Sequence, residues 1–92
     1  MASFNITTAP QEIAPRTNNK RAIIINNPSD TDIYCSTSPF VTATADANTG
    51  IPVKAGGNMT ISPSDDYANS CGLAWYAVHA GTGNKQLIVN FL

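Results

Sequence analysis

Residues 20–28 of this chain read KRAIIINNP, the densest run of β-branched side chains in the sequence, followed at once by a turn signal. On an extended chain Ile23 and Ile25 point to one side, and Ala22 and Ile24 point to the other. An apolar run of this kind predicts a central strand that is buried on both faces. A chain this short supplies one covering layer from its own second sheet. We expect the other layer to come from another copy or from a large host surface.

The composition indicates one small domain with an uncharged polar surface. The chain has 92 residues, of which 12% are charged, and it contains ten Asn, ten Thr and seven Ser. Burial in a domain of this size only just offsets the conformational entropy lost on folding, and oligomerisation widens that margin, so we expect a homo-oligomer. The net charge of -1 lacks the basic character of a nucleic-acid-binding protein, so no nucleic-acid partner is expected.

The sequence carries no signal for export or for membrane insertion. The opening residues MASFN run directly into polar sequence and do not form a secretory leader. No apolar stretch reaches the roughly 20 residues that a membrane-spanning helix needs. We therefore expect a soluble protein that is made in the cytoplasm and has no membrane partner. In that reducing compartment Cys35 and Cys71 are expected to be buried thiols, with a disulfide between them as the alternative.

Short β-rich runs separated by turn signals follow residues 20–28. Ile33 and Cys35 alternate with polar residues and are predicted to point inward, unless the register is reversed and Tyr34 does so. Residues 40–45 form another β-rich run. Each run is too short to be buried alone, so these segments predict strands of one shared core.

The C-terminal part of the chain gives the clearest strand pattern. Residues 73–80 and 85–92 are two β-rich runs that flank a loop with two glycines, which predicts a hairpin. A proline within residues 51–54 indicates a short edge strand. Because no window shows a sustained helical period, residues 20–92 are predicted to form an all-β domain, a small antiparallel β-sandwich or jelly roll.

Residues 1–19 are predicted to form an extended N-terminal arm. Phe4, Ile6 and Ile13 are apolar but lie among polar residues and two prolines, a pattern that cannot build an independent core. We expect such an arm to dock onto an edge strand of a host surface, with Arg16 and the basic pair at 20–21 meeting acidic groups. The alternative is that it forms the first strand of its own sandwich, because residues 4–7 alternate like a strand.

Residues with catalytic or metal-binding potential are few and scattered. His79 is the single histidine, and Cys71 precedes it without a third group to orient the pair. The aspartates lack the spacing of a metal-binding loop, and Gly56-Gly57 does not precede a helix as a phosphate-binding loop would. We therefore predict no catalytic residue, no metal site and no cofactor, and a protein that is not an enzyme.

Three aromatic residues suggest a different class of function. Trp75, Tyr76 and Tyr34 could together form a platform for a sugar ring, which would make the chain a carbohydrate-binding module. In a small β domain aromatic side chains mostly fill the core or an interface, so this function is kept as the alternative.

The order of the sequence signals resembles that of small β-sandwich structural proteins from the virions of tailed bacteriophages. The resemblance covers about residues 20–92 and rests on the motifs Arg21-x-Ile23-x-Ile25-Asn26-Asn27, Asp32-Ile33-Tyr34, Gly50-Ile51-Pro52-Val53-x-Ala55-Gly56-Gly57, Trp75-Tyr76-Ala77-Val78 and Gly81-Thr82-Gly83. It implies a capsid decoration or cement protein, located on the virion surface, which binds the major capsid protein or another virion protein, commonly as a trimer. A tail or head-fibre component is the other location that it implies.

The interface that we predict from these patterns joins the arm, the central strand and the chain end. An apolar C-terminus normally needs a buried site, which a neighbouring subunit could provide. The predicted interface residues are Phe4, Ile6, Ile13, Arg16, Arg21, Ile23, Ile25, Phe91 and Leu92.

Overall fold

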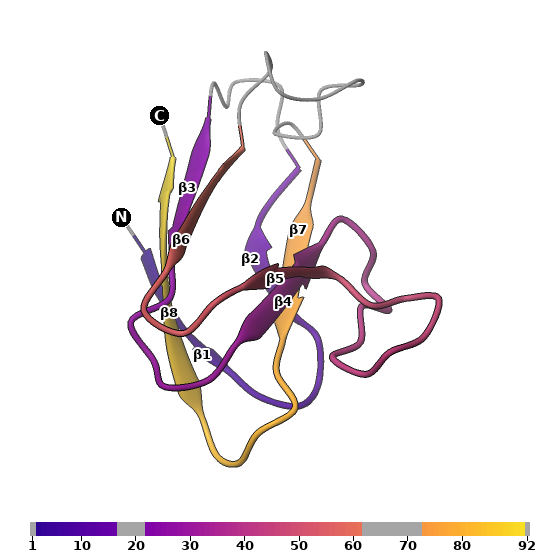
Figure 1. Cartoon of the computed structure of the whole chain (residues 1–92). Coiled ribbons are helices and arrows are strands. Elements are labelled where there is room, and N and C mark those ends of the chain that lie inside the picture. The colour runs from indigo at the N-terminus through magenta and orange to yellow at the C-terminus, as the bar shows by residue number, and fades with distance from the viewer. Residues whose placement is uncertain (1, 17–21, 62–72, 92) are drawn as a thin grey trace.

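The chain folds into two antiparallel four-stranded sheets that pack against each other (Figure 1). This computed structural model describes residues 2–16, 22–61 and 73–91. Sheet A contains, in spatial order, β1 (Ala2–Ile6), β8 (Lys85–Phe91), β3 (Ile23–Asn26) and β6 (Asn58–Ile61). Sheet B contains β2 (Gln11–Ala14), β7 (Trp75–Val78), β4 (Ile33–Ser36) and β5 (Ile51–Val53). The prediction of an all-β antiparallel sandwich is confirmed. None of the described residues belongs to a helix that could cross a membrane.

The strand that the KRAIIINNP run predicts is β3, and it lies inside sheet A between β8 and β6. Ile23 and Ile25 have no exposed surface, because their side chains point into the space between the sheets. Ile24 points outward and is half-buried. The second sheet therefore covers one face of this strand, as predicted, and burial of the other face by another copy or a host surface stays a prediction. A two-layer sandwich covers one face of each strand and leaves the other to solvent or to a partner.

The N-terminal residues pair as strands of the sandwich itself. β1 pairs with β8 in sheet A, and β2 pairs with β7 in sheet B. Ile6 is 0% exposed and Ile13 is 1% exposed, so both are core residues. These pairings show the alternative, in which the segment forms a first strand of its own sandwich. The docking-arm hypothesis is therefore wrong for β1 and β2. Pairing with β7 and β8 satisfies the backbone of an extended segment and buries its apolar side at the same time.

The connection between β7 and β8 is not the hairpin that the sequence predicts. β7 lies in sheet B and β8 lies in sheet A, so the chain crosses between the sheets over residues 79–84. A loop with two glycines is compatible with either a hairpin or such a crossing, which must cover the roughly 10 Å between packed sheets. The β1–β2 connection makes the same crossing, and the two lie side by side because the His79 N–H donates to the Thr7 carbonyl at 3.1 Å.

The core between the sheets is made of aliphatic side chains around one tryptophan. Trp75 is 4% exposed and points inward from β7, with Ala77. Ile33 and Cys35 point inward from β4, as predicted, so Tyr34 points outward. The buried core consists of Ile6, Ile13, Ala14, Ile23, Ile25, Ile33, Cys35, Val53, Ile61, Trp75, Ala77, Leu87 and Val89.

Residues 40–45, which the sequence predicts to be a strand, form part of a long loop between β4 and β5. The Asp46 carboxylate accepts hydrogen bonds from the Thr42 hydroxyl at 2.7 Å, the Thr44 hydroxyl at 3.1 Å and the Asn48 N–H at 2.7 Å. These bonds, the one from Thr42 above all, hold the pKa of Asp46 below its usual value. Side-chain bonding of this kind offers the backbone an alternative to a strand ladder, so β propensity does not decide the conformation here.

The loop returns to the sheet at a position that only glycine fits. A Cβ atom on Gly50 would lie 2.7 Å from the Cys35 carbonyl oxygen and 2.8 Å from Val41 Cγ2. The residues that follow form β5, an edge strand of sheet B that contains Pro52, as the sequence predicts. Glycine therefore allows the loop to press against β4 before β5 begins.

Candidate functional site

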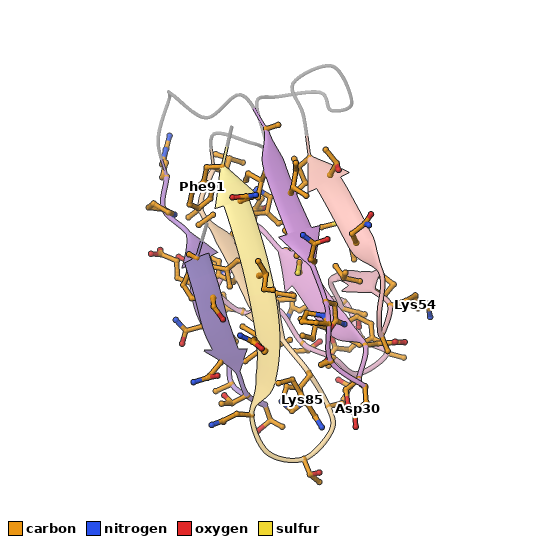
Figure 2. The ribbon with its side chains drawn as sticks, turned by 90° about the vertical axis from the view of Figure 1, so that its left-hand side faces the viewer. Asp30, Lys54, Lys85 and Phe91 are labelled. Atoms are coloured by element: carbon orange, nitrogen blue, oxygen red, sulfur yellow. The ribbon has the colours of Figure 1, made fainter. Side chains whose placement is uncertain are left out.

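The outer face of sheet A carries no charged side chain among the residues that the structure describes. Strand alternation places nine side chains on it, and we call this surface the amide face because most of its polar groups are amides. Among the described strand residues of sheet A the single charged side chain is Lys85, which lies at the start of β8 and forms a 2.9 Å ion pair with Asp30 (Figure 2). The amide face consists of Ser3, Asn5, Ile24, Asn26, Asn58, Thr60, Gln86, Ile88 and Asn90.

Two isoleucines lie at the centre of the amide face. Ile24 is opposite Asn90, and Ile88 is opposite Asn26, so the two isoleucines are diagonal neighbours on β3 and β8. These are the two inner strands of the sheet, and both side chains are half-buried. The polar groups lie around them, and at one side Gln86 Nε2 donates to the hydroxyl oxygen of Ser3 at 2.6 Å. An apolar centre within a neutral polar rim is the anatomy of a protein interface.

The structure does not bring the predicted interface residues together on one surface. The four isoleucines of that set are core residues, and Phe4 packs against the core from its edge. Phe91, at the end of β8, is 39% exposed (Figure 2), and Arg16 is exposed. Arg21 and Leu92 lie outside the described residues. Sequence reasoning chose the inward isoleucines of β3 and missed Ile24 and Ile88, although their alternation with Ile25 and Val89 carries the signal.

Sheet B presents a different outer face. Tyr34 and Tyr76 are half-buried and point outward from adjacent strands. Trp75, which the sequence grouped with them as a sugar platform, points into the core instead. The alternation of residues 75 and 76 on one strand makes this separation unavoidable, since neighbours on a strand face opposite sides.

One buried asparagine ties the turn after β3 to sheet B. Asn27 Nδ2 donates to the carbonyl oxygens of Thr31 and Val53, each at 2.8 Å. Its Oδ1 accepts from the Ser29 N–H at 3.1 Å and from the Ser29 hydroxyl at 2.6 Å. Its backbone N–H donates to the Gly57 carbonyl at 2.9 Å. All the hydrogen-bonding groups of this 1% exposed side chain are used, so Asn27 is a structural residue.

His79 stabilises residues 79–84, the segment that crosses from sheet B to sheet A. Its side chain is 1% exposed, Nδ1 accepts from the Gly81 N–H at 2.9 Å, and Nε2 lies 2.8 Å from the Gly83 carbonyl oxygen. The Gly81 N–H can only donate, so Nδ1 must be an acceptor. In the neutral ring the proton is therefore on Nε2, which donates a hydrogen bond to the Gly83 carbonyl oxygen. Both ring nitrogens therefore bond to the loop backbone that the histidine stabilises.

The acidic side chains of the described chain are spread over separate contacts. Lys85 beside Asp30 lowers the pKa of that carboxyl group. The Ala55 N–H, at 2.9 Å, is the main cause of a lowered pKa at Asp32, which also forms an ion pair with Lys54. Within residues 2–16, 22–61 and 73–91, no cluster of three or more acidic, histidine or cysteine side chains could hold a metal ion.

Cys35 is a free thiol in the core, and we predict that it resists alkylation in the folded protein. Burial raises its pKa from 9.0 to about 12. Since the folded pKa exceeds the unfolded one, the contribution of this thiol to stability is complete below pH 9.0 and is lost as the pH rises toward 12. In a Cys71→Ser background, mass spectrometry after iodoacetamide treatment at about pH 8 should show modification only in denaturant. Rapid modification of the native protein would contradict the burial of Cys35, because the reagent would have to reach the core.

The chain was compared with protein-family models, with curated proteins and with solved structures, and nothing matches it. The amide face and the outer face of sheet B are the two sheet surfaces that face away from the core.

Proposed function

We propose that this chain is a non-enzymatic structural protein of a bacteriophage virion, which decorates the capsid lattice as an oligomer. The amide face is the observation that carries the proposal. It offers many amide and hydroxyl groups and no charge, so contacts made through it are insensitive to salt. A repeating shell multiplies weak contacts of this kind into stable attachment.

The apolar centre of the amide face supports self-association. Ile24 and Ile88 lie on β3 and β8, the segments in which the sequence places the subunit contact, but on the outer side of those strands. Covering them in an assembly gives β3 the second buried face that its sequence predicts. The oligomer proposed is a homotrimer, a number that the resemblance to virion proteins supplies.

The partner proposed is the major capsid protein, and the location is the capsid surface. Cryo-EM of purified phage particles from the source of this chain tests both. The expected result is a copy of the eight-stranded sandwich bound at repeated positions of the capsid shell. Density on a tail or head fibre would move the protein to the other location that the resemblance implies. Particles that contain no copy of the chain would overturn the proposal.

A charge placed at the centre of the amide face is expected to prevent assembly. The Ile24→Glu variant puts a carboxylate where the proposed contact excludes water, and burying an unpaired charge costs several kcal/mol. Light scattering should show the wild type at about three times the 9.7 kDa chain mass and the variant at the chain mass. The matched control is Ile51→Glu, because Ile51 is 52% exposed and lies in sheet B.

Two results would contradict a homo-oligomer formed through the amide face. A wild type that stays at the chain mass up to high micromolar concentration would refute the homo-oligomer. Loss of assembly in Ile51→Glu, with Ile24→Glu still assembled, would place the contact on sheet B. Circular dichroism of each variant shows that the sandwich is retained before its mass is interpreted.

A further inference from the structure

The two outward tyrosines of sheet B form one aromatic patch. In the β4–β7 pairing, Ser36 is opposite Tyr76 and Tyr34 is opposite Val78. The tyrosines are therefore diagonal neighbours across adjacent strands, a position in which Cβ atoms lie about 7–8 Å apart and long side chains share one surface. Both are half-buried, so each contributes an accessible ring surface.

A separate groove, which the two tyrosines do not line, lies between the end of β7 and the loop that joins β4 to β5. Val78, opposite Tyr34, lines the groove together with Pro10, Pro39 and Phe40, and the groove has a volume of about 510 Å³. Phe40 is 73% exposed, and a large apolar side chain at the rim of a groove adds to its binding surface. The size is that of a small-molecule site, which usually combines apolar walls with a few polar groups.

The charge on this face disfavours an anionic ligand, and its carboxylate can bind a ligand that carries hydroxyl groups. Glu12 on β2 is opposite Tyr76, and the Tyr76 hydroxyl lies 3.4 Å from Glu12 Oε2. Glu12 is the single charged residue within the four strands of sheet B, as far as the structure describes them. A carboxylate accepts hydrogen bonds from ligand hydroxyl groups and repels phosphate, sulfate and carboxylate ligands.

From this geometry we infer that the outer face of sheet B binds a neutral carbohydrate chain. The rings of Tyr34 and Tyr76 stack against the C–H faces of sugar rings, and Glu12 accepts hydrogen bonds from sugar hydroxyl groups. The groove beside Phe40 receives the neighbouring sugar unit. This site is independent of the proposed capsid attachment, because that function uses the opposite sheet.

NMR titration of the full chain with neutral hexasaccharides tests the inference. The probes are the hexamers of β-1,4-glucose, α-1,4-glucose, β-1,4-mannose and β-1,4-N-acetylglucosamine. At least one is expected to shift the backbone amides of residues 34–44 and 76–80. Tyr34→Ala and Tyr76→Ala should each weaken binding by about fivefold or more, since each removes one stacking ring. Tyr76→Phe keeps the ring and should bind more tightly than Tyr76→Ala.

Ile51→Ala is the matched control, because it removes an exposed apolar side chain from the same sheet without touching the proposed site. The inference is overturned if no hexasaccharide shifts any amide, or if the shifts map to the amide face. Wild-type affinity in a folded Tyr34→Ala variant would also overturn it. If the same amides shift with protein concentration alone, the occupant is a second copy and not a carbohydrate. None of these outcomes affects the cryo-EM test of capsid decoration, so either proposal can be refuted while the other stands.

Discussion

The Asn27→Asp substitution is expected to lower the free energy of unfolding by about 3–5 kcal/mol, although the two side chains have the same shape. The amide of Asn27 donates to the carbonyl oxygens of Thr31 and Val53, and a carboxylate can donate to neither. The variant therefore loses both donated hydrogen bonds, although the Thr31 carbonyl keeps the one from the Ser29 hydroxyl at 3.0 Å, and it places a charge in a site that is 1% exposed. A loss of this size is a large part of the roughly 5–14 kcal/mol that stabilises a domain of this length.

Urea unfolding monitored by tryptophan fluorescence measures this loss, because Trp75 lies in the core. The matched control is Asn84→Asp, which makes the same chemical change at an exposed position of the loop before β8, outside the amide face. That change should cost less than about 0.5 kcal/mol, as surface substitutions usually do. Equal losses in the two variants would show that charge alone, and not the lost donor, controls stability.

The Ile25→Ala substitution is expected to cost about 2–5 kcal/mol, because it opens a cavity under a fully buried strand position. Ile25 is 0% exposed and is paired on both sides, with Met59 on β6 and Val89 on β8. The same substitution at Ile24, one residue earlier, removes a half-buried side chain from the outer face. In the isolated chain Ile24→Ala should therefore cost much less.

Comparing the two variants at several protein concentrations also tests assembly. If the amide face is covered in an oligomer, the cost of Ile24→Ala rises with protein concentration toward that of Ile25→Ala, since association stabilises the folded chain by mass action. Chemical denaturation at low and high micromolar concentration measures this change. A cost for Ile24→Ala that is small at every concentration would mean that this face stays in contact with water.

The residues on the amide face show why the candidate site was harder to predict than the fold. Alternation predicts that Ile24 and Ile25 face opposite sides of β3, but it does not say which side meets the second sheet. The interface predicted from the sequence contains Ile23 and Ile25, which point inward. Which side of β3 faces sheet B depends on how both sheets assemble, and β3 takes its place in sheet A by pairing with residues 58–61 of β6 and 88–91 of β8, which are distant in the chain. No local pattern contains that information.

By itself, the sequence determined several of the local elements, because these follow from the side chains of a few adjacent residues, whereas residues 40–45 form a loop that β propensity did not predict. The β-branched run of β3, the alternation of β4 and the proline in β5 predicted strands that the structure contains. Only the tertiary structure decided which strands share a sheet. β7 and β8 separate into different sheets, and the N-terminal segment supplies a strand to each. The physical reason is that backbone hydrogen bonds join any two extended segments equally well, so the choice of partner depends on which arrangement buries the inward faces of all eight strands together.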